Sequence, residues 1–281
     1  MASEKFARSA SIGVFDSGLG GLSVLQHIRQ TLPHEALIYV ADSGFAPYGD
    51  KTSAEILERS IAVTDFLLSK HIKALVVACN TATAAAISHL RLHYPDLIIV
   101  GMEPGLKPAS LLSKTKKVGV LATLSTIQSE KYQGLRAQLS ADTGVEFIAQ
   151  ACIGLVDQIE KVEANTDQTR LLLKKYLNPL LAANVDTLVL GCTHYPFVAS
   201  LVQELTSAHI PHGEPIKLID TGKPVASRIQ RLLVERDLTT SDSDIPRINV
   251  YTNGNPEKLK YACTQWIKIP EEKLSISTFS A

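Results

Sequence analysis

Short apolar runs alternate along the chain with longer segments of helical periodicity. Such runs are typical of buried strands, and the longer segments are typical of helices. In the first hundred residues the predicted strands are 11–16, 36–42, 74–79 and 96–101, and the predicted helices are 21–33, 52–71 and 81–95. Thr52 is the expected N-cap of the second helix, and Glu55 stands three residues on, the spacing of a capping box. This alternation predicts parallel sheets covered by helices on both faces.

The same pattern then starts again. KVGVLAT (117–123) resembles SIGVFDS (11–17), and TLVLGC (187–192) resembles ALVVAC (74–79). Between them we expect a helix over 126–140, a strand over 145–151 and a long helical region from about 154 to 183. The sequence therefore predicts two similar α/β units related by a weak internal repeat.

A proline- and glycine-rich stretch, EPGLKP (103–108), marks the expected switch between these units. The segment after Ile216 predicts a strand, a turn and a helix, which we expect to return to the first unit. The predicted domains are residues 1–102 with 217–281, and residues 103–216.

The composition argues against several classes of protein. The 281 residues carry 28 Lys and Arg and 28 Asp and Glu, so there is no net positive charge to favour binding of nucleic acid or an anionic membrane. No apolar stretch approaches about 18 residues, and the N-terminal MASEKFARSAS lacks the apolar core of a signal peptide. We expect a cytoplasmic protein. Its four cysteines form no CxxC pair, so the sequence predicts neither a metal site nor, in a reducing cytoplasm, disulfides.

Each unit ends a predicted buried strand with a cysteine followed by polar residues at an expected helix start. The two segments are Cys79-Asn80-Thr81 and Cys192-Thr193-His194. In open α/β sheets ligands bind beyond the carboxyl ends of strands, and helix N-termini suit anions and lower a thiol pKa. Packing alone is the alternative for a buried cysteine. Two cysteines at matching places in a repeat favour a functional role.

Asp16 ends the first predicted strand and precedes a glycine-rich turn. The spacing fits neither phosphate-binding glycine motif, and a carboxylate would repel a phosphate. We expect Asp16 to hold an ammonium group or to orient and polarise a thiol; a capping role stays open. His194 lies two residues from Cys192 and could help to form its thiolate, although a surface histidine is the alternative.

Two thiols facing one cleft suit the inversion of a stereocentre. One base removes a proton from one face of the carbon, and the conjugate acid of the other delivers a proton to the opposite face. A cysteine titrates near about 8.5, so both forms are accessible near neutral pH. The substrate would be a small acid with an ammonium group.

The sequence resembles the glutamate racemases of the cofactor-independent aspartate/glutamate racemase family. The stretches that carry the resemblance are IGVFDSGLGGLSVL (12–25), YVADSGFAPYGDKT (39–52), VVACNTATA (76–84), VGVLAT (118–123), LVLGCTHYPF (188–197) and LIDTG (218–222). They cover most of the chain, and the combination of CNTA with GCTHYP is highly specific.

The resemblance implies that L- and D-glutamate are interconverted without pyridoxal phosphate or metal, to supply D-glutamate for bacterial peptidoglycan, cell-wall biogenesis and cell shape. It implies that Cys79 acts on the D-enantiomer and Cys192 on the L-enantiomer, assisted by Asp16 and His194. The matching substrate-binding residues are Asp16, Ser17, Pro47, Tyr48, Gly49, Asn80, Thr81, Thr193 and His194. Thr123 and Thr126 would add contacts, and Glu160 would support the second thiol. The site would lie between two α/β domains, in a possible homodimer.

Two alternatives remain open. An aspartate racemase of the same superfamily would use the same two thiols. A two-lobed binding module would close on a small anion without chemistry and would tolerate serine at Cys79 and Cys192. Cys152 and Cys263 are expected to be structural.

Overall fold

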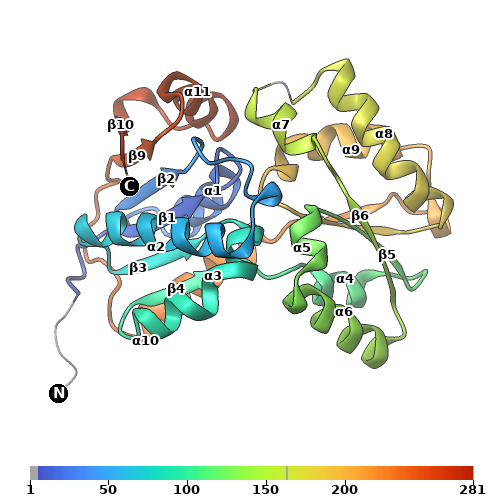
Figure 1. The fold of residues 1–281 in the computed structure, drawn as a ribbon, viewed down its shortest axis with the longest axis horizontal. Helices are drawn as coiled ribbons and strands as arrows, with labels where there is room; N and C mark the ends of the chain where they lie inside the picture. The colour runs from blue at the N-terminus through green and yellow to red at the C-terminus, as the bar shows by residue number, and fades with distance from the viewer. Residues whose placement is uncertain (1–5, 163, 281) are drawn as a thin grey trace. The chain divides into compact units, whose positions relative to one another are not determined.

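A computed structural model describes residues 6–162 and 164–280. These residues divide into two compact units, one made by the chain up to Met102 together with Gly222 onward, the other by Glu103–Thr221. Each unit contains its own parallel sheet with helices packed on it (Figure 1). Residues 1–5 and 281 of the first predicted domain, and residue 163 of the predicted helical region 154–183, lie outside the described residues.

The order of elements follows the alternation expected from the sequence. The strands are β1 (Ile12–Asp16), β2 (Leu37–Ala41), β3 (Ala74–Val77), β4 (Ile98–Gly101), β5 (Lys117–Ala122), β6 (Glu146–Ala151), β7 (Thr187–Gly191), β8 (Lys217–Ile219), β9 (Ile248–Thr252) and β10 (Leu274–Thr278). The α-helices are α1 (Leu22–Thr31), α2 (Ser53–Ser69), α3 (Asn80–His93), α4 (Leu106–Leu112), α5 (Leu124–Gln128), α6 (Glu130–Thr143), α7 (Leu155–Glu160), α8 (Asp167–Ala182), α9 (Ala199–Thr206), α10 (Gly222–Glu235) and α11 (Pro256–Tyr261). Short 3-10 helices include η1 (Tyr48–Asp50) and η2 (Tyr195–Val198).

The first sheet has the strand order β10-β9-β2-β1-β3-β4, with every neighbouring pair parallel. All residues of β1, β2 and β3 are buried, as expected for strands covered on both faces. Helices α2 and α3 supply one cover (Figure 1), and their Val63 and Ala86 share a core cluster with Phe15 and Val77. Helices α1 and α10 pack against each other.

The second sheet repeats the plan of the first. Its order is β6-β5-β7-β8, and each neighbouring pair is parallel. Strands β1 to β4 have the equivalent order β2-β1-β3-β4, so the same winding occurs twice. Val120 and Val189 from this sheet share a core cluster with Leu106 and Tyr132 from the helices. The expectation of two parallel-sheet α/β domains is confirmed.

Two predicted helices are each divided in the structure. The segment expected as one helix over 126–140 contains α5 and α6, because the hydroxyl of Ser129 accepts the N–H of Tyr132 and caps a new helix. The region expected from 154 to 183 contains α7 and α8, and Thr166 caps the second of these through the N–H of Thr169. The second break is signalled in the sequence, because residues 163–170 (EANTDQTR) contain only one apolar residue. The break at Ser129 depends on its hydroxyl cap.

The return to the first unit comes later than the sequence analysis placed it. Strand β8 pairs in parallel with β7, with Lys217 opposite Thr187. Residues 217–221 therefore lie in the second unit, and the chain re-enters the first at Gly222. Strands β9 and β10 were not predicted; they extend the first sheet beyond β2.

The expected capping box is confirmed at the start of α2. The Thr52 hydroxyl accepts the N–H of Glu55 at 3.3 Å, and the Glu55 carboxylate accepts the N–H of Thr52 at 2.8 Å. Within residues 6–162 and 164–280, every helix is too short or too polar to pass through a bilayer.

Candidate active site

Cys79 stands at the carboxyl edge of the first sheet, directly before α3. It is the N-cap residue of this 14-residue helix, and its Sγ accepts the N–H of Ala82 at 3.4 Å. The Ser17 hydroxyl, which follows β1, lies 3.8 Å from the same sulfur. The thiol is 5% exposed. A sulfur at a helix N-terminus meets the positive end of the helix dipole, which favours the thiolate.

Asp16 holds the glycine-rich turn beside this thiol edge. Its fully buried carboxylate accepts the N–H of Gly18 at 3.1 Å and the N–H of Gly21 at 3.0 Å. A Cβ at Gly21 would lie 2.5 Å from the Asp16 Cβ, so only glycine fits there. These hydrogen bonds hold the turn before α1, whose N-cap residue is Gly21 rather than Asp16. The role of Asp16 toward a thiol or an ammonium group stays a prediction.

The other predicted residues of the first unit lie in two segments, the start of α3 and the loop before α2. Asn80 and Thr81 form the buried first turn of α3. The Asn80 Nδ2 is buried and has no hydrogen-bond partner among the described residues, which leaves it as a donor for a ligand. Pro47, Tyr48 and Gly49 lie in the loop between β2 and α2.

Tyr48 is held as a neutral hydrogen-bond donor. Burial, the charge and hydrogen bond of Asp42, and the charge of Cys79 together raise the pKa of Tyr48. Its hydroxyl donates to Asp42 Oδ2 at 2.5 Å. The phenol therefore stays protonated near neutral pH.

In the second unit, an imidazole contacts a thiol through one ring nitrogen and a carboxylate through the other. Cys192 Sγ is 3.6 Å from His194 Nδ1, and His194 Nε2 is 2.5 Å from Glu160 Oε1. His194 is 2% exposed. Burial alone would lower the pKa of His194, but hydrogen bonds to Cys192 and Glu160 and their charges raise it well above its usual value. A protonated His194 can stabilise a thiolate at Cys192.

The structure differs from the sequence analysis at the start of the segment after Cys192. His194 precedes the 3-10 helix η2, and the α-helix α9 begins only at Ala199. Cys192 is therefore not at the N-terminus of an α-helix. The group beside its sulfur is the imidazole of His194 rather than a helix N-terminus.

Thr123 and Thr126 lie at the same sheet edge as Cys192, because Ala122 of β5 is opposite Gly191 of β7. The Thr123 hydroxyl donates to Thr126 Oγ1 at 2.9 Å and accepts the Thr126 N–H, which caps α5. Thr193, between the thiol and the imidazole, is buried. The predicted residues thus divide into two sets, one in each unit.

Cys152 and Cys263 differ from the other two cysteines. Both are buried, and burial raises the pKa of each thiol to about 12. They stay protonated near neutral pH, which fits the structural role expected for them. In the part of the chain described, no group of three or more His, Cys, Asp or Glu side chains is placed to hold a metal ion.

Replacing Glu160 with glutamine tests whether His194 is protonated, because its protonation changes how the stability of the protein depends on pH. Because the folded-state pKa of His194 is raised, its contribution to the unfolding free energy is complete below the unfolded pKa of about 6.5. That contribution is lost at about 1.4 kcal/mol per pH unit as the pH rises toward the folded-state pKa. Glu160→Gln removes the charge and lowers that pKa, so stability should fall less steeply with pH. Urea unfolding from about pH 5.5 to pH 9 measures the slope; an unchanged slope would contradict the assignment.

Known proteins share this arrangement of chain and fold. The family model described as Asp/Glu/hydantoin racemase matches residues 12–228. A glutamate racemase of Pseudomonas syringae pv. tomato is 49% identical over 246 residues, which are 84% of this chain and 86% of that protein. The crystal structure of a glutamate racemase isoform from Bacillus anthracis covers 97% of this chain and 98% of its own, with a TM-score of 0.83 and 30% identity. A Francisella tularensis glutamate racemase in complex with D-glutamate has the same coverage, a TM-score of 0.82 and 27% identity. With most of its length matched in both sequence and fold, this chain belongs to the Asp/Glu/hydantoin racemase family.

Proposed function

We propose that this protein interconverts L- and D-glutamate, with Cys79 and Cys192 as the two acid/base groups. The observation that carries the proposal is the chain of contacts from Cys192 through His194 to Glu160 in the second unit. A second thiol, Cys79, follows the equivalent strand of the first unit. One thiol with a basic partner suits many reactions, but a second thiol at the matching strand end suits inversion of a stereocentre.

In the L-to-D direction, the Cys192 thiolate removes the Cα proton of L-glutamate. The Cys79 thiol delivers its own proton to the opposite face of the same carbon. The product is D-glutamate, with Cys192 now a thiol and Cys79 a thiolate, and the reverse direction exchanges the two roles. His194 stabilises the Cys192 thiolate by charge and hydrogen bonding. In the same way Asp16 would assist Cys79.

The substrate would be held by donors at both strand ends. The Nδ2 of Asn80 and the hydroxyls of Thr81 and Thr193 are buried groups that suit a carboxylate. The Ser17 hydroxyl lies within 3.8 Å of the Cys79 sulfur and so marks where the reacting carbon would approach. Thr123 and Thr126 would add hydroxyl contacts from the second unit.

Glutamate is the substrate that the relatives favour. The similar proteins named above are glutamate racemases, and one of them holds D-glutamate. We further propose that the product supplies peptidoglycan synthesis, so cells that lack this protein would need added D-glutamate to grow. Growth of such cells without D-glutamate would contradict that role.

Proton NMR in heavy water tests the reaction. Purified protein without added cofactor should remove the Cα proton signal of L-glutamate and, separately, of D-glutamate, and each enantiomer should give the other. Each turnover replaces the proton with solvent deuterium, since a thiol exchanges with water. Exchange of aspartate but not glutamate would favour an aspartate racemase. Absence of exchange with both amino acids would favour a binding module.

A further inference from the structure

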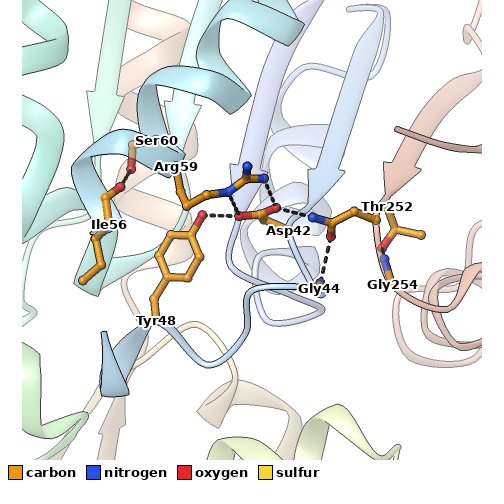
Figure 2. A network of polar contacts seen from close by, with 9 residues as sticks. Asp42, Gly44, Tyr48, Ile56, Arg59, Ser60, Thr252 and Gly254 are labelled. Carbon is orange, nitrogen blue, oxygen red and sulfur yellow. Dashed lines mark hydrogen bonds and ion pairs between the residues drawn. The ribbon is translucent and has the colours of Figure 1, made fainter. Parts of the chain in front are cut away.

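The carboxylate of Asp42 is a fully buried junction at the end of β2. Its Oδ2 accepts the Tyr48 hydroxyl at 2.5 Å and the Arg59 Nε–H at 3.1 Å. Its Oδ1 accepts the Arg59 Nη2–H and the Asn253 Nδ2–H, both at 2.6 Å. Figure 2 shows Tyr48 and Arg59 directed at the carboxylate from two sides. The acceptor capacity of the carboxylate is thus filled by four donors.

These donors come from segments far apart in the chain. Tyr48 belongs to the loop between β2 and α2, and Arg59 belongs to α2. Asn253 follows β9 and is separated from Asp42 by 211 positions. One buried carboxylate therefore joins the loop to α2 and to the segment that follows β9.

Arg59 and Asn253 also contact the first half of the same loop. The Asn253 Oδ1 accepts the N–H of Gly44 at 2.8 Å, and a Cβ at Gly44 would lie 3.1 Å from the Asn253 backbone oxygen and its amide carbon. The Arg59 guanidinium lies 3.9 Å from the ring centroid of Phe45. Each of the two residues thus fixes both Asp42 and a residue just after it.

We infer that Arg59 and Asn253 are positioning residues, which hold the loop of Pro47, Tyr48 and Gly49 in its substrate-binding conformation through Asp42. This inference rests on the proposed function, and on the family resemblance, which implies that those three residues bind the substrate. The Tyr48 hydroxyl is already used by Asp42. The network therefore aids substrate binding by holding the loop in one conformation before the substrate binds.

The test is Asn253→Ala, which removes one donor to Asp42 and the acceptor for Gly44. The loop should become mobile, so binding should weaken while the thiols stay in place. We expect KM for L- and D-glutamate to rise together by about ten-fold, with kcat within about three-fold of wild type. Hydrogen exchange of the 43–50 amides, measured without substrate, should become faster.

Asn255→Ala is the matched control. Asn255 lies two positions on, and its side chain caps α11 through the N–H groups of Glu257 and Lys258. The same substitution there should lower stability as a lost cap does, but leave KM and exchange of the 43–50 amides unchanged. A rise in KM in both variants would show a general loss of stability and overturn the inference.

Arg59 provides the second variant, in case Asn253→Ala folds poorly. Arg59→Leu should raise KM, and Arg59→Lys, which keeps the charge and one donor, should restore part of the loss. If wild-type protein racemises glutamate but Asn253→Ala and Arg59→Leu bind it normally, the inference fails and the proposed function stands. If wild-type protein leaves glutamate unchanged, the proposed function fails, and the exchange of residues 43–50 alone then decides whether Asn253 holds the loop.

Discussion

Serine at either Cys79 or Cys192 is expected to lower racemisation by about 10² to 10⁴-fold in both directions. A serine hydroxyl keeps the helix cap at position 79, but it is not ionised near neutral pH. In the proposed mechanism each thiol is the base in one direction and the acid in the other, so neither direction survives the loss of one thiol. L- and D-glutamate have equal free energies in water, so kcat/KM must fall equally for the two enantiomers. Circular dichroism of the amino acid, starting from each enantiomer, measures both rates.

The two remaining cysteines provide a control in each unit. Cys263→Ser in the first unit and Cys152→Ser in the second make the same atomic change at buried thiols with a raised pKa. Both variants should lose some stability but keep kcat close to wild type. If all four serine variants lost activity alike, the effect would come from folding, and the two-thiol mechanism would lose its support.

Replacing His194 with asparagine is expected to lower kcat by about 10² to 10³-fold, with KM little changed. Asparagine is uncharged, so the Cys192 thiolate loses its cationic partner 3.6 Å away. Removal of the proton from L-glutamate by Cys192 then becomes the slowest step. The deuterium isotope effect should therefore rise for L-glutamate labelled at Cα and fall for labelled D-glutamate.

The opposite variant sharpens this test. Asp16→Asn should affect the Cys79 side of the reaction, so its isotope effects should change in the reverse sense. Equal isotope effects for both enantiomers in His194→Asn would mean that the imidazole does not act through Cys192. The contact between His194 and Cys192 would then contribute to the stability of the protein and not to proton transfer.

Much of the fold could be predicted because its strands are continuous apolar runs. The strand that ends at Asp16 and the strand that precedes Cys79 are buried throughout. Such strands are continuous apolar runs, so the polar residue after each run marks its end. The repeat then predicted the second thiol at an equivalent place. The helix break at Ser129 was missed because it depends on a single hydroxyl cap. The break near Thr166 was missed because one helical region was predicted across the polar stretch 163–170.

The pairing of distant segments could not be predicted in the same way. β8 is three residues long, and its membership of the second sheet depends on register with Thr187. Asp42 lies within a stretch that carries the family resemblance. Nothing in the sequence indicates that Arg59 and Asn253 both bind its carboxylate. Arg59 is a charged residue of an amphipathic helix, and Asn253 lies in a polar turn 211 positions from Asp42.

The attachment of β9 beside β2 has a consequence for synthesis of the chain. The second unit is one continuous segment, but the first sheet needs strands from both ends of the sequence. At about 5–20 residues per second, β2 emerges from the ribosome roughly ten to forty seconds before its neighbour β9. Through that interval the apolar strand LIYVA is an unpaired sheet edge, the kind of surface that joins other chains. Newly made copies of this protein are thus most open to aggregation at Leu37–Ala41 until the last strands are complete.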